Sequence, residues 1–147
     1  MTIAVDASLA LKWVLPEEHT EEAWALLQAW RLQAETLIAP PIFRPEVANA
    51  LHRSARRGII TGPETSDALR MLTPTIVIEE PAGLYPRALT LAVEFRLGTV
   101  YDALYVALAE YRGCELWTGD RRLVRAVQPQ MPLVHWVGEV GGRVGPP

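Results

Sequence analysis

Asp102 stands at the start of a stretch in which nearly every residue is apolar (TVYDALYVALA). Two other aspartates, Asp6 and Asp120, each follow a short apolar run that predicts a β-strand, TIAV and CELWT respectively. Burying an unpaired carboxylate costs free energy, because the charged group loses its hydration. Each of these acids therefore needs a specific role, which is either structural or chemical.

The structural interpretation is that each aspartate caps a helix. Aspartate is a preferred N-cap residue, because its carboxylate accepts hydrogen bonds from the free amide groups at a helix start. Asp6 and Asp120 directly precede segments with helical character, and Thr99 with Asp102 matches the capping-box pattern S/T-x-x-D/E. For each residue taken alone, capping explains its type as well as a chemical role does.

The chemical interpretation depends on four acids taken together. Glu46 lies in the first turns of the helix that follows the strand TLIAP, and Asp102 begins the helix that leads into the strand CELWT. In a parallel α/β sheet, ligands bind beyond the carboxyl ends of the strands. Asp6, Glu46, Asp102 and Asp120 are all expected at this one edge, where they could converge on a single pocket.

Four clustered carboxylates need a cation. At ~5 Å separation and an effective dielectric of ~20, each pair repels by roughly 3 kcal/mol. The three histidines are far apart in sequence and the single cysteine is isolated, so the sequence offers no nitrogen or sulfur ligand set. Carboxylate oxygens alone select hard ions such as Mg²⁺ or Mn²⁺, which typically serve phosphate chemistry.

Polar neighbours fit the same site. Ser8 lies two residues after the first acid, Thr118 two residues before the fourth, and Asn49 one helical turn beyond Glu46. The hydroxyls could hold a carboxylate or a metal-bound water, and hydrogen bonding in a turn or cap explains them equally well. We treat these three as supporting residues of the predicted site.

The elements that position these residues alternate along the chain. Apolar runs predict strands at 2–5, 36–40, 75–80, 114–118 and 132–136. Stretches bounded by Pro, Gly or acidic residues predict helices at 7–15, from 16 to about 30, and at 45–58, 61–72, 85–98, 100–113 and 120–127. This alternation predicts an α/β domain with a largely parallel central sheet and helices on both faces.

Composition favours a single domain. The chain has 147 residues, of which 50% are hydrophobic, and its Gly- and Pro-rich end predicts a domain at 1–137 followed by a flexible tail at 138–147. The net charge of −3 argues against a protein that coats nucleic acid, although a local basic patch is compatible with it. Because no run reaches the ~18 apolar residues of a membrane span and no signal-peptide pattern is present, we expect a cytoplasmic protein.

The segments VDAS, PEVANAL, TVYDALYVALAE and WTGDRRL, in this order and spacing, resemble the PIN-domain family of metal-dependent ribonucleases. Within that family they resemble the VapC-like toxins of toxin–antitoxin pairs, over roughly residues 2–137. The resemblance implies a three-layer α/β/α fold. It also implies that the family's four acids correspond, in order, to Asp6, Glu46, Asp102 and Asp120, with Thr118 where the family often carries Ser or Thr.

The resemblance further implies the chemistry and the partners. A toxin of this kind is a Mg²⁺- or Mn²⁺-dependent endoribonuclease that hydrolyses RNA phosphodiesters. Asp6, Asp102 and Asp120 would be direct ligands, and Glu46 would be a ligand or would orient the attacking water. Such toxins pair as homodimers and are inhibited by an antitoxin whose tail enters the acidic site, and no membrane is involved. An aspartate sometimes found after the fourth acid is absent, because Arg121 follows, so the number of ions stays open.

Arginine accounts for 13 of the 14 basic residues, and its planar guanidinium suits phosphate recognition. With RNA as the implied substrate, two groups of arginines are candidates for contacts with its backbone. They are Arg53, Arg56 and Arg57 on one predicted helix, and Arg121, Arg122 and Arg125 beside the fourth acid. A solvated helix face explains both groups equally well.

Two other functions are compatible with parts of the sequence. An aspartate-based phosphatase also places its nucleophile after a first strand, but it normally carries a second Asp two residues further on and a downstream phosphate-binding lysine. This chain has Ser8 at the first position, and its one lysine is Lys12. The non-enzymatic alternative is a PIN-like module that binds RNA or a partner without cutting, and the complete acid set argues against it.

Overall fold

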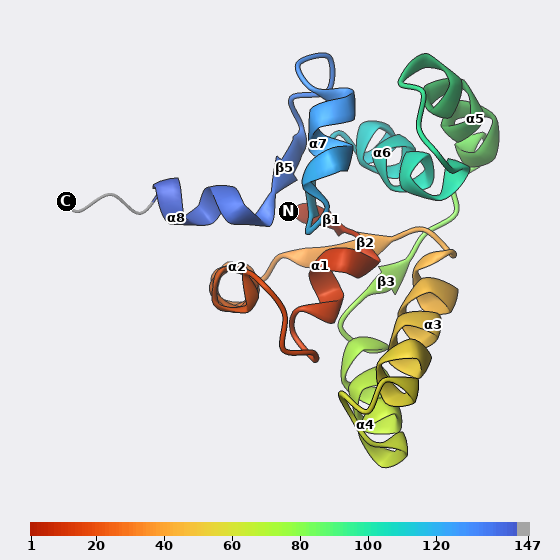
Figure 1. The fold of residues 1–147 in the computed structure, drawn as a ribbon. Coiled ribbons are helices and arrows are strands. Elements are labelled where there is room, and N and C mark those ends of the chain that lie inside the picture. The colour runs from red at the N-terminus through yellow and green to blue at the C-terminus, as the bar shows by residue number, and fades with distance from the viewer. Residues whose placement is uncertain (144–147) are drawn as a thin grey trace.

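The computed structural model describes residues 1–143 and contains a five-stranded sheet whose neighbouring strands are all parallel. The strand order is β3-β2-β1-β4-β5, so the first strand of the chain occupies the centre (Figure 1). The strands are β1 (Thr2–Val5), β2 (Thr36–Ala39), β3 (Val77–Ile78), β4 (Glu115–Thr118) and β5 (Val134–Trp136). In this register Ala4 of β1 is paired with Ile38 on one side and with Leu116 on the other.

Helices connect the strands and cover both faces of the sheet. The helices are α1 (Ala7–Leu11), α2 (Thr20–Leu32), α3 (Phe43–Arg56), α4 (Gly62–Leu72), α5 (Leu84–Glu94), α6 (Val100–Arg112), α7 (Arg121–Val127) and α8 (Val140–Arg143), with a 3-10 helix, η1 (Val137–Glu139). In Figure 1, α5 and α6 lie above the sheet, and α1, α2 and α3 lie below it. The predicted three-layer α/β/α fold is therefore confirmed.

Uninterrupted apolar runs place the strands and α6 in the interior. The last three residues of β1, β2 and β4 are all buried, as expected for parallel strands covered on both faces. Residues 103–109 of α6 are also all buried, because this helix packs between α5 and the strands β1 and β4. Since α6 leads into β4, its first turn, with Asp102, lies at the carboxyl end of the sheet.

Several element boundaries differ from the predictions. α1 ends at Leu11 and α2 begins at Thr20, because the chain turns between them, and the Glu17 amide donates to the Thr20 hydroxyl at 3.1 Å. β3 has two residues where a longer strand was predicted. Short edge strands limit unwanted pairing with other chains. Thr61 and Glu64 form a capping box at the start of α4, which begins where the sequence predicted.

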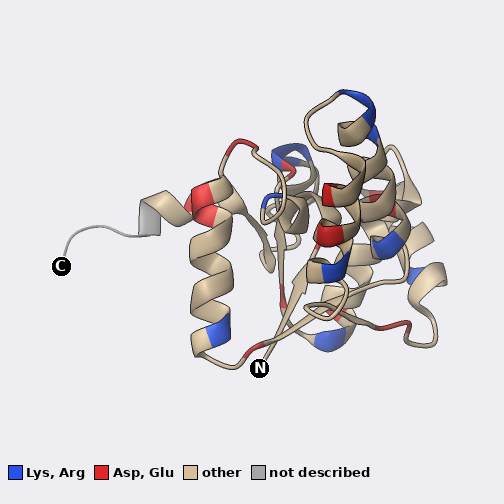
Figure 2. Cartoon of the chain, turned by 90° about the horizontal axis from the view of Figure 1, so that it is seen from below, with Lys and Arg blue, Asp and Glu red and all other residues tan. Residues whose placement is uncertain are grey.

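α2 has its charges arranged as the helix dipole favours. Glu21 and Glu22 lie in its first turn, and Arg31 lies in its last turn (Figure 2). Glu17 and Glu18 lie before this helix, which begins at Thr20 and not at residue 16.

The tail that was predicted to be flexible from residue 138 begins with helical structure. η1 and α8 together cover residues 137–143, and both contact α2. Val137 is buried and Val140 packs against the core, so this Gly-rich segment has apolar anchors. Residues 144–147 lie outside the described residues, and the predicted domain boundary stays a prediction.

Candidate active site

Asp6 ends β1 and begins α1, and hydrogen bonds hold both oxygens of its carboxylate. Oδ1 accepts from the Leu9 amide at 2.9 Å and from the Ser8 hydroxyl at 2.7 Å. Oδ2 accepts from the Thr118 hydroxyl. Asp6 is only 4% exposed. It caps α1, as the structural interpretation predicted, and it also presents a fixed carboxylate at the carboxyl end of the sheet.

The chain passes close to α1 where β4 ends. The Thr118 hydroxyl accepts from the Asp120 amide at 2.9 Å, and the Ser8 hydroxyl accepts from the Gly119 amide at 2.9 Å. A Cβ atom at Gly119 would lie 2.7 Å from Cε of Lys12 and 3.0 Å from the Ser8 carbonyl oxygen, so a larger residue would push these segments apart. The two hydroxyl residues that the sequence singled out therefore join the ends of β1 and β4.

Asp102 and Asp120 face a shared hollow of about 290 Å³, which Arg96, Thr99 and Arg122 also line. Asp120 caps α7 by accepting from the Arg122 amide at 2.9 Å, and it pairs with the guanidinium of the same residue at 3.6 Å. Asp102 accepts no hydrogen bond from residues 1–143, and Thr99 makes no side-chain cap bond. The suggested capping box at Thr99 and Asp102 is therefore absent, because the carboxylate faces the hollow instead.

Glu46 lies in the first turn of α3, and its carboxylate accepts a hydrogen bond from the Tyr105 hydroxyl at 2.6 Å. Burial, followed by the charge of Glu46, raises the pKa of Tyr105, so this hydroxyl keeps its proton and acts as a donor. The sequence analysis did not identify Tyr105, because a tyrosine in a buried helix resembles an ordinary core residue. Its position three residues after Asp102, on the same side of α6, is the signal that could have found it.

Asn49, predicted as a supporting residue, is not joined to the acids. Its side chain is exposed on α3, and it makes no hydrogen bond with any of the four carboxylates within residues 1–143. Asn49 lies on the same helix as Glu46, but the hydrogen bond to the Glu46 carboxylate comes from Tyr105 on α6 and not from Asn49. A role for Asn49 stays a prediction.

The four acids influence one another electrostatically. Burial raises the pKa of Asp6 to about 6, against the lowering effect of its hydrogen bonds, and the charge of Asp102 adds to the increase. Burial also raises the pKa of Glu46, where the hydrogen bond from Tyr105 opposes the increase and the charges of Asp6 and Asp102 add to it. The pKa of Asp102 is raised by burial and then by Asp120. The carboxylates therefore form one electrostatically coupled group.

The chemistry of these donors fits a hard metal ion. Every candidate ligand is a carboxylate oxygen, and the hydroxyls of Ser8 and Thr118 lie beside them. Mg²⁺ and Mn²⁺ prefer such oxygen donors. Within residues 1–143, however, no three His, Cys, Asp or Glu side chains form a ready-made cluster that could hold an ion, so the fit is one of donor type.

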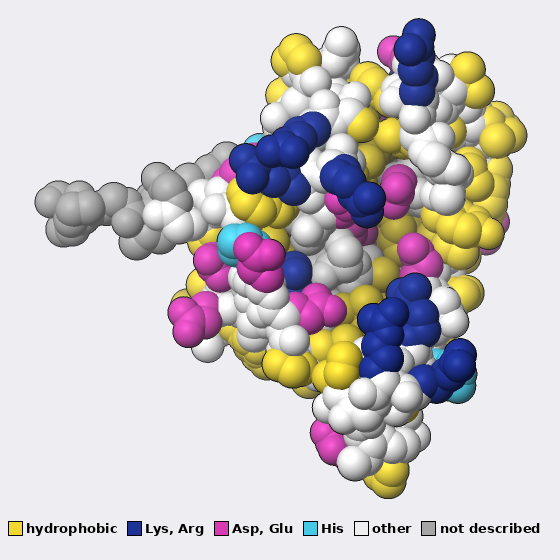
Figure 3. Space-filling model, viewed as in Figure 1, with side chains coloured by type: hydrophobic (Ala, Val, Ile, Leu, Met, Phe, Trp, Pro, Cys, Tyr) yellow, Lys and Arg dark blue, Asp and Glu magenta, His cyan; other side chains and the backbone are white. Residues whose placement is uncertain are grey.

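Basic side chains surround the acids. In Figure 3 acidic side chains lie in the central hollow, and basic side chains stand at its borders over α3 and α7. The three arginines near the end of α3 are exposed and form no ion pair within the described part of the chain; they are Arg53, Arg56 and Arg57. The guanidinium of Arg121 lies over the ring of Trp136 at 4.7 Å, while the Arg122 side chain is 91% exposed.

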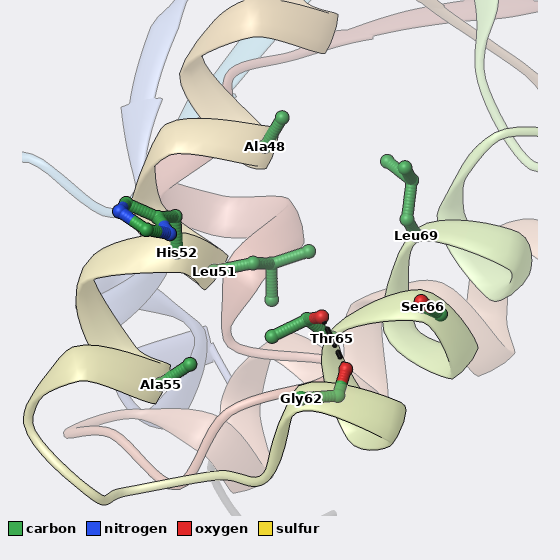
Figure 4. Close-up of a pocket in the computed structure, with 8 residues that line it drawn as sticks. All are labelled: Ala48, Leu51, His52, Ala55, Gly62, Thr65, Ser66 and Leu69. Atoms are coloured by element: carbon green, nitrogen blue, oxygen red, sulfur yellow. Dashed lines mark hydrogen bonds between the residues drawn. The ribbon is translucent and has the colours of Figure 1, made fainter.

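A second hollow, of about 260 Å³, lies between α3 and α4 and contains none of the four acids. Small and apolar groups such as Ala48, Leu51 and Leu69 form much of its wall (Figure 4). The Thr65 hydroxyl at its edge already donates to the Gly62 carbonyl oxygen. Because no charged groups converge there, this hollow is not the candidate site.

The fold and the acids together define a class of protein. It is an α/β domain whose carboxylates, at the carboxyl end of a parallel sheet, suit metal-assisted chemistry on phosphates. The family model described as PIN domain matches residues 3–128. The chain belongs to the PIN-domain family, and the resemblance found in the sequence is confirmed.

Known relatives agree with this assignment over most of the chain. Ribonuclease VapC3 of Pyrobaculum aerophilum is 37% identical over 126 residues, which is 84% of this chain and 92% of that protein. Ribonuclease VapC9 of Mycobacterium tuberculosis is 33% identical over 132 residues, which is 89% of this chain and 95% of that protein. The crystal structure of PAE2754 from Pyrobaculum aerophilum is similar with a TM-score of 0.70 at 27% identity, and it covers 97% of both chains.

Proposed function

We propose that this protein is a metal-dependent endoribonuclease that hydrolyses RNA phosphodiesters, and that it is the toxin of a type II toxin–antitoxin pair. One observation carries the proposal: Asp6, Glu46, Asp102 and Asp120 form a coupled, partly buried acidic group at the carboxyl end of the sheet. Without a cation, the mutual repulsion of these carboxylates destabilises the protein. A bound cation would offset that repulsion. The ribonuclease names of the relatives support the choice of RNA as substrate.

In this proposal the side chains have distinct roles. Asp6, Asp102 and Asp120 hold Mg²⁺ or Mn²⁺, and Glu46 is a further ligand or orients the attacking water. A bound ion of this kind polarises the phosphate and lowers the pKa of a water molecule. Ser8 and Thr118 keep the Asp6 carboxylate in place, since they donate to opposite oxygens of it.

The phosphatase alternative lacks its cationic group. Lys12 is buried, and its Nζ donates to the Glu18 carbonyl oxygen at 2.8 Å and approaches Glu17 at 3.4 Å. Lys12 therefore fastens the loop before α2, whereas a phosphatase would need a lysine aimed at the phosphate beside Asp6. Ser8, at the position of that enzyme's second aspartate, binds Asp6 instead.

The partners are part of the proposal. On α2, Trp30 is buried and Trp24 is partly buried against the core, so this helix carries no fully exposed tryptophan. An exposed apolar stripe on α5 supports the expectation of a protein partner, whether antitoxin or second copy: Tyr85, Leu89 and Val93 are 45%, 58% and 80% exposed. Among residues 1–143 no helix is long and apolar enough to cross a membrane. The cytoplasmic location stays a prediction.

The decisive experiment is a cleavage assay with the purified, partner-free protein. We expect it to cleave single-stranded or looped RNA in the presence of Mg²⁺ or Mn²⁺, to stop when EDTA is added, and to resume when the metal is restored. Undiminished cleavage in EDTA would contradict metal dependence. Failure to cleave any RNA with either metal, in a protein shown to be folded, would contradict the nuclease assignment.

A further inference from the structure

Tyr105 carries a hydroxyl group in the middle of an apolar helix. Every other residue from 103 to 109 in α6 is apolar and buried, and Tyr105 itself is 1% exposed. Phenylalanine would fill almost the same volume without bringing a polar atom into the core. A buried hydroxyl costs free energy unless it is hydrogen bonded, so its presence points to the group that it binds.

The partner of this hydroxyl is one of the four acids. Tyr105 Oη donates to Oε1 of Glu46 at 2.6 Å, and this bond links α6 to α3 across positions that are 59 residues apart in the sequence. Tyr105 is also three residues beyond Asp102, so one helix supplies one acid directly and holds another through the hydroxyl.

Glu46 depends on this bond more than Asp6 depends on any single bond. The Asp6 carboxylate is held by the Leu9 amide, Ser8 and Thr118 together. Among residues 1–143 the only hydrogen bond to the Glu46 carboxylate comes from Tyr105. A glutamate side chain has one more rotatable bond than an aspartate, so its carboxylate can occupy more positions. The single rigid donor therefore determines where the carboxylate lies.

We propose that Tyr105 is a positioning residue: its hydrogen bond to Oε1 fixes the Glu46 carboxylate, which would bind a divalent cation or orient the attacking water. The proposal rests on the proposed metal-dependent ribonuclease function. Because Tyr105 is buried, it does not touch the RNA, and it acts through the Glu46 carboxylate that it binds. Partners that orient ligands in this way typically contribute ~10- to 100-fold to metal affinity or activity.

The test removes only the hydroxyl. Tyr105→Phe should bind Mg²⁺ ~10- to 100-fold more weakly in isothermal titration calorimetry without RNA, and kcat for RNA cleavage should fall while KM for RNA stays the same. Tyr111→Phe is the matched control, because Tyr111 lies on the same helix, is 65% exposed and makes no contact with the acids. It should leave Mg²⁺ affinity, kcat and KM unchanged.

A double-mutant comparison shows whether the effect passes through Glu46. In a Glu46→Gln background, adding Tyr105→Phe should cause no further loss of Mg²⁺ affinity, because the group that the hydroxyl positions is already altered. Additive losses would overturn the proposal, since Tyr105 would then act elsewhere. Should Tyr105→Phe prove unfolded in a thermal melt with EDTA, Glu46→Asp withdraws the carboxylate from the hydroxyl without disturbing the buried ring. That variant should lose Mg²⁺ affinity to a similar degree, and full affinity would overturn the proposal.

The two proposals fail in different ways. A wild-type protein that binds no Mg²⁺ and cleaves no RNA overturns the proposed function, and the role of Tyr105 with it. A wild-type protein that does both, with a folded Tyr105→Phe variant of equal Mg²⁺ affinity and kcat, overturns the role of Tyr105 alone.

Discussion

The acids at the carboxyl end of the sheet and the acids elsewhere on the protein differ in their partners. Elsewhere on the protein several acids are paired with cations: Glu110 with Arg87 at 2.7 Å, Glu79, just after β3, with Arg112 at 3.4 Å, and Glu35 with the amino terminus at 3.0 Å. At the carboxyl end, Asp6, Glu46 and Asp102 form no ion pair within the described residues. Asp120 is intermediate, because Arg122 lies 3.6 Å away.

This difference separates acids whose ion pairs contribute to stability from acids that make the metal-free protein less stable and are nevertheless retained. A surface pair contributes little, typically under ~1 kcal/mol, but it is not unfavourable. An unpaired, partly buried carboxylate near others of the same charge is unfavourable until a cation arrives. Removing acids or bases of either group should therefore have different consequences.

The largest difference is expected in catalysis. Asp102→Asn should reduce RNA cleavage by more than ~100-fold, because losing a ligand exceeds the ~10- to 100-fold effect of losing a supporting partner. Glu110→Gln, on the same helix but paired with Arg87, should leave cleavage unchanged. Initial rates at saturating Mg²⁺ measure both, and comparable losses in the two variants would abolish the distinction.

The second difference concerns pH. In the metal-free protein the pKa of Asp6 is about 6, compared with an ordinary value of 3.8, so the folded state binds this proton more tightly than the unfolded state. The free energy of unfolding should therefore fall as the pH rises from about 4 to about 6, by on the order of 3 kcal/mol at most. The pKa of paired Glu110 is lowered, so its contribution has the opposite sign.

Chemical denaturation in EDTA across this pH range measures the effect. Asp6→Asn should remove the part of the decrease that Asp6 contributes and leave the part from Glu46 and Asp102, since asparagine keeps a capping oxygen for α1 but does not ionise. If wild type and variant show the same pH dependence, the titration belongs to another group.

The third prediction separates a ligand from a cap at Asp102. Because its carboxylate accepts no hydrogen bond within residues 1–143, Asp102→Ala should leave the metal-free protein equally stable or more stable. Mg²⁺ at a hundred times its dissociation constant should stabilise the wild type by ~2.7 kcal/mol and the variant much less. Thermal melts with EDTA and with Mg²⁺ measure both. A loss of ~1 kcal/mol in EDTA, with the Mg²⁺ response intact, would identify Asp102 as a cap after all.

The smallest effect is expected from the arginines. Replacing the three unpaired arginines by Ala should weaken RNA binding and flatten its salt dependence by up to about 2 in the logarithmic slope, at ~0.7 per phosphate contact. The matched control replaces three paired arginines. The unpaired set is Arg53, Arg56 and Arg57, and the paired set is Arg70, Arg87 and Arg112. Filter binding in the Asp102→Asn background avoids cleavage, and equal effects of the two sets would show that only overall charge matters.

The sequence was sufficient to predict the sheet and the edge at which the acids lie. Apolar runs of strand length precede Asp6 and Asp120, and helix starts place Glu46 and Asp102. The sequence could not show which of two segments with the pattern S/T-x-x-D/E would form a capping box. Thr61 with Glu64 forms the box, but Thr99 with Asp102 does not. The longer glutamate reaches back to the N-cap amide, whereas the aspartate faces the hollow shared with Asp120.

Contacts between distant parts of the chain were also beyond the sequence. Tyr105 meets Glu46 only because α6 and α3 are brought together by the strands, and no local pattern marks the pair. Between α1 and α2, Lys12 donates to the Glu18 carbonyl oxygen and so joins the end of α1 to the intervening loop. A lysine in a sequence gives no sign that it will bind a backbone carbonyl rather than water.

The strand order has a consequence for the timing of synthesis. β1 is made first, yet one of its edges stays open until β4 has left the ribosome and paired with it. Thr118, which binds the Asp6 carboxylate, is 112 positions later in the chain, and Asp120 follows it. A nascent chain that has not reached β4 contains three of the acids but can assemble neither the sheet centre nor the full acidic group. Under the proposed ribonuclease function, translation must therefore pass residue 120 before the chain holds the complete site for RNA cleavage.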